Sequence, residues 1–493
     1  MSHGRRKLAA AAVAALTMAG CGQVPGQNNT PGTGNGPSQS PAPSAAAFAQ
    51  LNTTLVKGVK SVKLSSPKQH VSAELPDVPA STAYNLGLQI VRNRLLRDFN
   101  KATGKNFQMS WALTAASDSV LGVVLTANVT DSSGKTTSVP TTVWYDRASR
   151  HVYTAPALVE PTSWDAFTAE VGKAVTAAGG DQAKAAAALA ASPAPLGDGP
   201  AIGFNQQGDL VVAFRSGQVG DSVVTVKVPV DVAEPMLSVV GRKAKGASTH
   251  PSTYDPSSAI AATTGASAKA VATRPSADVV PDCKKLKCVS LTFDDGPGPR
   301  TKEVVDALIK KGAGATFFQL GDSIQADPDG VRYAAGSGNE VGSHTWRHDS
   351  LTGKSDEGDA YQLSRNIQAL QAITGDRPIM MRPPYGNHSA RVDRVIGRYG
   401  QVICIWDVDT LDWKTKSTPA TVASATSAKP GSVVLMHDIH DSTVDAVPQI
   451  IADLQSAGFT ILPMSELASP SDWGVGKYYC AAPSLKVECG VWG

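Results

Sequence analysis

Five short, largely apolar runs in the C-terminal part of the chain each lead directly to residues suited to metal or proton chemistry. Such runs, alternating with helix-like stretches, indicate buried parallel strands. In a barrel of parallel strands the carboxyl ends converge, and the chemistry takes place there. The runs and the residues that follow them are 289–293 with Asp294 and Asp295, 339–341 with His344 and His348, 379–381 with Arg382, 403–406 with Asp407, Asp409 and Asp412, and 433–436 with His437. The pattern predicts one assembled site, typical of a metal-dependent hydrolase.

The first two runs supply a candidate metal site. Asp294 and Asp295 precede a turn at Gly296 that can bring both carboxylates to one cavity, although Asp-Asp-Gly alone is more typical of a solvated turn. His344 and His348 are four residues apart, on one face if the segment is helical. Two surface histidines would explain that spacing equally well. With Asp295 they would form a two-His, one-carboxylate set for Zn²⁺, or for Co²⁺ or another divalent ion.

The last three runs supply candidates for proton transfer and substrate contact. Two prolines follow Arg382 and stiffen its segment, and its guanidinium would keep a neighbouring carboxylate ionised. Asp412 within reach of His437 would orient the imidazole and support its protonated form. Trp413 and Leu435 could wall a small apolar pocket, although core packing explains each of them equally well.

Taken together, segments 292–296, 344–348, 382–386, 407–413 and 435–437 resemble the five motifs of the polysaccharide deacetylase family, also called the NodB-homology domain or carbohydrate esterase family 4. The resemblance covers about residues 288–467 and implies an α/β fold, a distorted (β/α) barrel of seven or eight strands. The implied roles are metal ligand for Asp295, His344 and His348, general base for Asp294, tether of that base for Arg382, general acid for His437, support of that acid for Asp412, and oxyanion binding for the backbone N–H of Tyr385.

The resemblance implies a hydrolase that removes N-acetyl groups from N-acetylglucosamine residues of a cell-wall glycan, with peptidoglycan as the leading substrate. Chitooligosaccharides and acetylated xylan are alternatives that the motifs do not separate. A surface protein that binds or senses a partner such as lysozyme is a further alternative. The net charge of +3 is spread along the chain, so nothing indicates nucleic acid as a partner.

The N-terminus has the features of an export signal, with Arg5, Arg6 and Lys7 before an apolar stretch too short to span a bilayer. Residues 18–21 resemble a bacterial lipoprotein processing box, which predicts a signal peptide at 1–21 and lipid on Cys21. A plain cleavable signal is the alternative. We therefore expect an exported protein, held at the membrane through Cys21 or else secreted.

Composition predicts the order of the remaining domains. Residues 22–45 resemble a flexible tether, and 241–282 an Ala/Ser/Thr-rich linker before the catalytic domain at 283–493. Residues 46–240 predict a smaller α+β accessory domain, with helices at 84–99 and 164–191 and strands at 120–129, 141–145, 210–214 and 222–230. Segment 204–237 resembles the end of an extracellular domain found in some deacetylases and anti-sigma factors, which implies a possible protein partner.

The remaining cysteines and histidines are expected to be structural or exposed. Export favours short-range disulfides that join Cys283 to Cys288 and Cys480 to Cys489, although spacing does not fix the connectivity. Cys404 lies in an apolar run and is predicted to be a buried free thiol. His151, His388 and His440 match none of the motifs, and a structural or surface position is expected for each of them.

Overall fold

The computed structural model describes residues 46–194, 196–258, 276–484 and 489. The predicted signal peptide, Cys21 and the tether lie outside the described residues, as does 259–275 of the predicted linker. Among the described residues, no helix combines the length and the apolar character needed to cross a bilayer.

The C-terminal region, residues 283–484, is built on a curled sheet whose neighbouring strands all run parallel. Within the described part of the chain the order is β15-β16-β10-β11-β12-β13-β14-β18, and β17 pairs with the beginning of β10. The strands are β10 Lys287–Asp294, β11 Thr316–Gln319, β12 Glu340–Ser343, β13 Met380–Met381, β14 Val402–Cys404, β15 Val408–Asp409, β16 Val433–His437, β17 Phe459–Ile461 and β18 Tyr478–Tyr479. This arrangement confirms the predicted distorted barrel.

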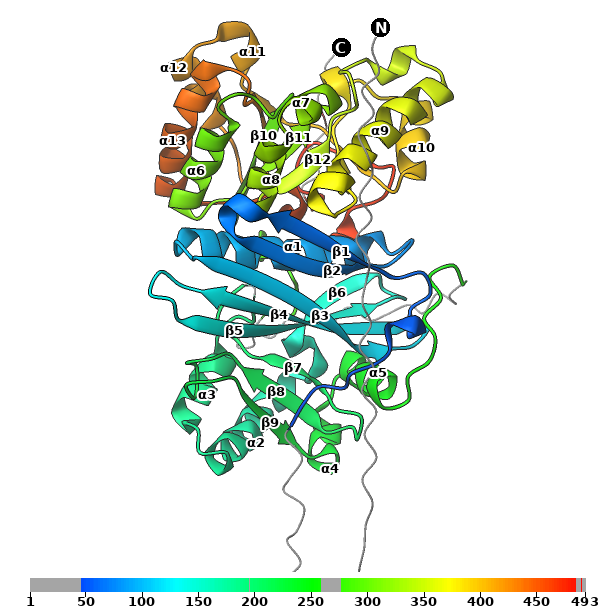
Figure 1. The fold of residues 1–493 in the computed structure, drawn as a ribbon, viewed down its shortest axis with the longest axis vertical. Coiled ribbons are helices and arrows are strands. Elements are labelled where there is room, and N and C mark those ends of the chain that lie inside the picture. Colours follow the sequence, from blue (N-terminus) through cyan, green and yellow to red (C-terminus); the bar gives the residue numbers. More distant parts are fainter. Residues whose placement is uncertain (1–45, 195, 259–275, 485–488, 490–493) are drawn as a thin grey trace, which may run out of the picture. The chain divides into compact units, whose positions relative to one another are not determined.

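Helices surround this sheet and bury its strands on both faces. Figure 1 shows β10, β11 and β12 between α6 and α13 on one side and α9 and α10 on the other. The helices are α6 Thr301–Lys311, α7 Gly321–Ala326, α8 Pro328–Gly336, α9 Asp356–Thr374, α10 Ala390–Arg398, α11 Asp412–Thr415, α12 Thr418–Ala425 and α13 Asp441–Ser456, with 3-10 turns at Leu351–Gly353, Pro384–Gly386, Met464–Leu467 and Pro470–Asp472. Because β10 is buried from Cys288 to Asp294, it reads as a continuous apolar run rather than an alternating one.

The N-terminal region, residues 46–258, contains two sheets. A six-stranded sheet has the order β1-β2-β3-β4-β5-β6, and a three-stranded sheet has the order β7-β8-β9. The strands are β1 Lys60–Ser66, β2 Val71–Asp77, β3 Asn106–Ala116, β4 Val120–Thr130, β5 Thr136–Asp146, β6 His151–Thr154, β7 Ala201–Phe204, β8 Leu210–Phe214 and β9 Val224–Val228. The helices are α1 Thr82–Lys101, α2 Trp164–Ala177, α3 Gln182–Ala190, α4 Val230–Ala233 and α5 Val239–Thr249, with 3-10 turns at Thr53–Leu55, Pro67–Gln69, Ala155–Leu158, Pro161–Ser163 and Glu234–Met236.

Two predictions in this part of the chain need correction. The helix expected over 164–191 is two helices, α2 and α3, because Gly179 takes a positive φ of 77° between them. The linker was expected to start at residue 241, but residues 241–249 belong to α5, which is ordered and packed. Its small residues permit close approach, and a Cβ at Gly241 would lie 2.0 Å from the carbonyl oxygen of Leu158. The small residues of α5, which suggested a flexible linker, therefore allow this helix to pack closely against its neighbours.

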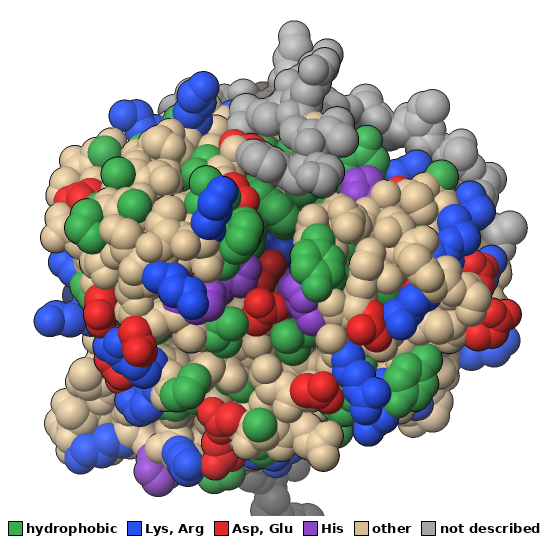
Figure 2. All heavy atoms as spheres, turned by 90° about the horizontal axis from the view of Figure 1, so that it is seen from above, with side chains coloured by type: hydrophobic (Ala, Val, Ile, Leu, Met, Phe, Trp, Pro, Cys, Tyr) green, Lys and Arg blue, Asp and Glu red, His purple; other side chains and the backbone are tan. Residues whose placement is uncertain are grey.

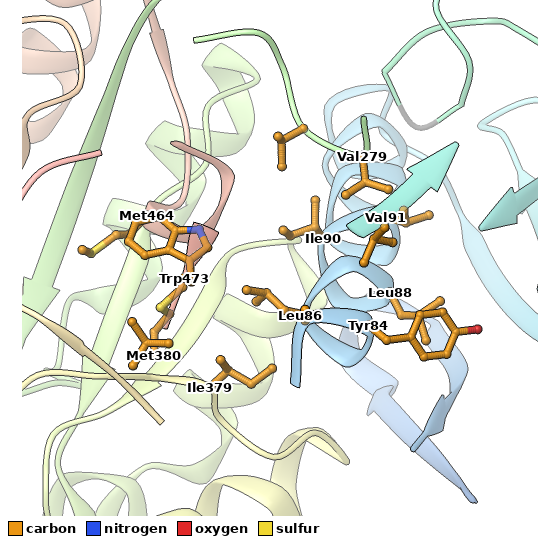
Figure 3. Packing of buried hydrophobic residues seen from close by; sticks show 14 of the residues in the cluster. Tyr84, Leu86, Leu88, Ile90, Val91, Val279, Ile379, Met380, Met464 and Trp473 are labelled. Atoms are coloured by element: carbon orange, nitrogen blue, oxygen red, sulfur yellow. The ribbon is translucent and has the colours of Figure 1, made fainter. Parts of the chain in front are cut away.

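Helix α1 packs against the C-terminal region through an apolar surface. Figure 3 shows Leu86 and Ile90 of α1 facing Met464 and Trp473, and all four belong to one buried cluster. Ile379 and Met380, just before the third site segment, extend the same cluster. The two regions therefore share a continuous core.

Buried ion pairs flank this apolar contact. Arg92 of α1 lies 2.6 Å from the carboxylate of Asp376. Arg94 and Arg97 both reach Glu466, at 2.9 and 2.5 Å. A charge removed from water is stabilised only when its partner is in place. These ion pairs therefore favour one relative position of α1 and the C-terminal region.

The predicted disulfides are both present, joining Cys283 to Cys288 and Cys480 to Cys489. Cys404 is a buried free thiol, as expected. The Cys283–Cys288 disulfide lies at the start of β10, and the Cys480–Cys489 disulfide lies just after β18. Each disulfide therefore fixes a chain segment next to the first or the last strand of this sheet.

Candidate active site

The predicted site residues gather at the carboxyl ends of the parallel strands. Strand β10 ends at Asp294 and β16 ends at His437, and the parallel register places these two residues directly opposite each other. Arg382 follows the end of β13, and its backbone N–H donates to the carbonyl of Ser343 at the end of β12. Figure 2 shows acidic and histidine side chains in a hollow, with hydrophobic side chains on both sides.

Asp295, His344 and His348 form a cluster able to hold a metal ion. We call these three residues the metal cluster. One ligand atom from each residue lies within 4.8 Å of the other two, and Oδ1 of Asp295 is 3.4 Å from the Nε2 atom of each imidazole. The helical spacing considered for the two histidines is wrong, because 344–348 is an irregular loop after β12. Positive φ values at Thr345 and His348, 69° and 59°, turn the loop so that both rings converge.

The state of these atoms fits a cation. Oδ1 of Asp295 is buried and has no hydrogen-bond partner among the described residues. Nδ1 of His344 lies 2.6 Å from the carbonyl oxygen of Arg382, which can only accept, so this nitrogen carries the proton and Nε2 presents its lone pair to the cluster. Burial raises the pKa of Asp295, but the neighbouring imidazoles outweigh it and hold that pKa below its usual range. The donor set therefore fits a divalent metal such as zinc.

The two imidazoles differ in their electrostatic surroundings. Burial and the neighbouring His344 lower the pKa of His348, which keeps it neutral and available as a ligand. For His344, burial also lowers the pKa, but Asp294 and Asp295 outweigh this and raise it. A cation at the cluster would compete with that proton for Nε2 of His344.

Arg382 fixes the carboxylate of Asp294. Its Nη1 atom donates to Oδ1 of Asp294 and to the hydroxyl of Thr292, both at 2.8 Å. Its Nε and Nη2 atoms donate to the carbonyl oxygens of Cys404 and Ile405, both at 3.0 Å. The guanidinium is fully buried, and these four hydrogen bonds fix it against the ends of β14 and β10. Its positive charge is thereby held at a defined position beside Asp294.

His437 and Asp412 form a second buried pair. Nδ1 of His437 lies 2.9 Å from Oδ1 of Asp412, while Oδ2 of Asp412 accepts from the backbone N–H of His437 and the hydroxyl of Thr443, at 2.7 and 2.6 Å. Burial alone would lower the pKa of His437. The hydrogen bond and charge of Asp412, with the charges of Asp294 and Asp295, raise it instead to about 9. The imidazole is therefore protonated at neutral pH, with Nε2 able to donate.

The predicted substrate-contacting residues differ in exposure. Tyr385 is 59% exposed, adopts a φ of 62°, and its ring lies 4.6 Å from that of His348. Trp413 is 48% exposed, whereas Leu435 is buried with 3% exposed. The structure thus brings Tyr385 to the metal cluster and leaves the indole of Trp413 accessible.

Comparisons with known proteins agree with this geometry. Residues 282–403 match the family model described as polysaccharide deacetylase. A Bacillus cereus protein named peptidoglycan-N-acetylglucosamine deacetylase is 36% identical over 190 residues, which are 36% of this chain and 68% of that protein. This chain belongs to the polysaccharide deacetylase family.

Two further relatives of this deacetylase-family chain are longer proteins. It is 36% identical over 183 residues to peptidoglycan-N-acetylmuramic acid deacetylase PdaC of Bacillus subtilis, covering 37% of this chain and 38% of that protein. It is 38% identical over 205 residues to peptidoglycan-N-acetylglucosamine deacetylase PgdA of Listeria monocytogenes, covering 41% and 42%. The chain thus spans about two fifths of the length of these two relatives.

Of the three acids after the fourth run, only Asp412 pairs with His437. Asp407 accepts from the hydroxyl of Ser432 at 2.8 Å and from the backbone N–H of Val433 at 2.7 Å, so it joins two chain segments. Asp409 accepts from the backbone N–H of Leu411 at 2.8 Å and shapes the turn before Asp412.

Sequence reasoning missed Asp438 of this family member, the buried residue that follows His437. Its carboxylate accepts from the hydroxyl of Thr301, and a Cβ at Gly296 would lie 2.5 Å from its Oδ1 atom. Burial raises the pKa of Asp438 to about 7. Its carboxylate therefore packs closely against the turn that follows Asp295. The signal was present, because the fifth run ends in His-Asp much as the first ends in Asp-Asp.

The three histidines set aside in the sequence lie at or near the surface. His388 is partly buried, and its Nδ1 atom pairs with Asp393 at 3.0 Å. The ring of His440 lies 5.9 Å from that of His437, so it borders the site without joining the His437–Asp412 pair. His151 lies 3.6 Å from Asp278, away from the strand ends.

Proposed function

We propose that this chain is a metal-dependent hydrolase that removes N-acetyl groups from N-acetylglucosamine residues of peptidoglycan. The observation that carries the proposal is the register that sets Asp294 opposite His437, beside the cluster of Asp295, His344 and His348. A carboxylate and a protonated imidazole thus lie beside each other at the strand ends. Amide hydrolysis needs a proton acceptor and a proton donor in such positions.

The chain's own residues account for both proton transfers. Asp294, held in place by Arg382, takes the proton of the attacking water as the water oxygen bonds to the acetyl carbon. The C–N bond then breaks, and Nε2 of His437 gives its proton to the departing nitrogen, leaving acetate and a free amine. Zn²⁺ or Co²⁺ held by Asp295, His344 and His348 would supply Lewis-acid polarisation of the carbonyl and acidify the bound water.

Tyr385 and Trp413 are proposed to contact the substrate. The backbone N–H of Tyr385 would donate to the oxyanion as the carbonyl is attacked. The exposed indole of Trp413, with Leu435 beneath the strand ends, would border the acetyl methyl group. These contacts orient the amide between Asp294 and His437.

Peptidoglycan is supported by the names of the relatives, which are peptidoglycan deacetylases that differ in the amino sugar named. Chitooligosaccharides and acetylated xylan are the competing substrates. The His437–Asp412 pair favours an amide over an ester, because an alkoxide departs with less help from an acid than an amine does.

Acetate release tests the proposal. Purified full-length chain is incubated with peptidoglycan, chitooligosaccharides and acetylxylan, with and without a chelator. We expect release from peptidoglycan that the chelator abolishes and Zn²⁺ restores, with new free amines on glucosamine by mass spectrometry. Amines on muramic acid would reassign the sugar. Release from acetylxylan alone, or release that resists chelation, would contradict the proposal.

We further propose export and a membrane anchor at Cys21. Two disulfides suit an oxidising compartment, and the relatives are named for a cell-wall polymer. Expressed in a bacterium that processes lipoproteins, the wild type should fractionate with membranes, and Cys21→Ser should appear in the medium. Equal release of both proteins would contradict the anchor but leave export intact.

The competing reading is a binding or sensing protein whose N-terminal region captures a partner such as lysozyme. The full-length Asp294→Asn variant discriminates better than an isolated catalytic fragment, because α1 shares a core with the catalytic domain. Lysozyme binding by wild type and variant alike, with no acetate release from either protein, would favour the sensor.

A further inference from the structure

The last described segment of the chain completes the parallel sheet. On one side, β18 pairs with β14, with Tyr478 opposite Ile403. On the other side, Ala481 bridges Ser432 just before β16, and the backbone N–H of Ala482 donates to Gly431 at 2.9 Å. We name residues 474–482 the closing segment, because it lies between the strand that anchors Arg382 and the strand that carries His437.

The two tyrosines of β18 have different surroundings. The ring of Tyr479 packs 5.0 Å from that of Trp473, and its hydroxyl bonds the backbone of Gly474 and Asp472 at 2.9 and 3.1 Å. Tyr478 is 49% exposed, and its ring lies 4.5 Å from the imidazole of His388. Packing accounts for Tyr479, whereas much of the Tyr478 ring remains available to a ligand.

Two ring pairs meet the loop that carries Tyr385 and His388, and we call these four residues the row of rings. The imidazole of His348 lies 4.6 Å from the ring of Tyr385, and the same loop leads three residues later to His388. Asp393 holds the His388 imidazole at 3.0 Å, and Tyr478 lies against it. One loop therefore contacts both the candidate metal ligand His348 and Tyr478.

Exposed apolar side chains are frequent on the segments that follow the strand ends. Among the described residues nine large hydrophobic side chains are exposed, and five of them lie on these segments or on the closing segment: Tyr385, Leu411, Trp413, Ile439 and Tyr478. Exposed apolar groups gathered on a polar surface mark ligand-binding sites. The pyranose ring suits such a surface, because its faces carry C–H groups and its edge carries hydroxyls. An aromatic face with a polar tip matches that pattern.

We propose that Tyr478, held by His388, forms a sugar subsite that binds a second pyranose of the glycan while another reacts at the metal cluster. The subsite rests on the proposed function and deepens it, since it predicts a preference for longer chains. The flat ring of Tyr478 stacks on the sugar, and its hydroxyl reaches the sugar edge. His388 acts through Tyr478 as a positioning residue.

The test compares substrates of different length. Full-length wild type, Tyr478→Ala and Tyr478→Phe are assayed for acetate release from N-acetylglucosamine dimers and hexamers. We expect the hexamer-to-dimer ratio of kcat/KM to fall about tenfold in Tyr478→Ala through a higher KM for the hexamer, and to stay near wild type in Tyr478→Phe. The control is Tyr361→Ala, an exposed tyrosine on α9 outside the row of rings. An unaltered ratio in Tyr478→Ala would overturn the proposal.

Two additions keep the outcome unambiguous. Tyr478→Val removes the ring but keeps a residue that suits a strand, so a folded variant is available if the alanine protein unfolds. Hexamer binding is also measured by calorimetry on the Asp294→Asn background. If Tyr478→Val weakens hexamer binding about tenfold but the wild-type enzyme releases no acetate, the proposed deacetylase activity is refuted and the subsite is retained. Equal hexamer binding with and without the ring would refute the subsite itself.

Discussion

Arg382 and Asp294 form a buried ion pair in which Nη1 lies 2.8 Å from Oδ1. The arginine also donates to the carbonyl oxygens of Cys404 and Ile405, so the end of β14 positions a carboxylate at the end of β10. The pair is costly to bury and stable only when intact. Asp294 also lies 3.7 Å from Nε2 of His344, and this position supports the proposal that Asp294 receives a proton.

Asp294→Asn should reduce kcat at least a hundredfold, because the amide cannot accept the proton of the attacking water. The protein should still bind Zn²⁺, since Asp295, His344 and His348 are unaltered. The measurements are kcat on chitooligosaccharide or peptidoglycan and metal content by elemental analysis. Asp445→Asn, on the outer helix α13, is the matched control. Substantial turnover by Asp294→Asn would remove the assigned base.

Arg382→Lys should lose both stability and activity. A lysine cannot reach Asp294, Cys404 and Ile405 together, so buried acceptors lose their donor. We expect about 2–4 kcal/mol of destabilisation in urea and a fall in kcat. Arg300→Lys, at an exposed ion pair, should shift stability by less than about 1 kcal/mol. Equal stability of the two variants would show that the Arg382 contacts contribute little.

The activity should decline at alkaline pH. His437 must be protonated to act as an acid, and Asp412 raises its pKa to about 9, so kcat/KM should fall as the pH rises through that value. The raised pKa also stabilises the fold below the ordinary histidine pKa of about 6.5, and this contribution disappears as the pH rises through 9.

Asp412→Asn tests the origin of that shift. Without the carboxylate, burial lowers the pKa of His437, so the alkaline limb of the kcat/KM profile should move to lower pH. Asp445→Asn, on the outer helix α13, is the control. An alkaline limb at the same pH in Asp412→Asn and wild type would refute the assigned pair.

Metal binding should stabilise the folded protein and depend on the cluster. Saturating Zn²⁺ should raise the Tm of the wild type. At a Zn²⁺ concentration of a hundred times the Kd, the free energy of unfolding should rise by about 2.7 kcal/mol. His348→Ala should lose most of that increase and keep the apo Tm, because His348 lies on a loop and makes no β-ladder contact. Differential scanning calorimetry with added metal measures both. An equal Zn²⁺ effect in wild type and variant would place the ion elsewhere.

The contact between α1 and the catalytic domain should contribute strongly to stability. Ile90→Ala should destabilise the chain by about 2–5 kcal/mol, because it leaves a cavity against Met464 and Trp473. The exposed Leu286→Ala is the control. Urea unfolding followed by tryptophan fluorescence measures both. A catalytic domain that unfolds at the same urea concentration in Ile90→Ala and wild type would show that it is independent of α1.

The residue sequence by itself was enough to predict which candidate residues gather at one edge of the sheet and which strands carry them. Asp294, Arg382 and His437 each stand at the end of a buried run. Parallel strands bring their carboxyl ends to one edge whatever the connecting helices contain, so order along the chain was enough to predict a shared site. The disulfide partners were foreseen for a similar reason, because the cysteines are close in sequence.

Only the tertiary structure decided how these groups meet. The loop that brings His344 and His348 together depends on positive φ angles that local sequence does not dictate. The placement of Tyr478 beside His388 depends on the pairing of β18 with β14, strands about 75 residues apart in the chain, and the burial of α5 depends on a carbonyl of Leu158. Such contacts depend on the packing of the whole chain, because the free energy of burying one surface depends on all the residues that pack against it.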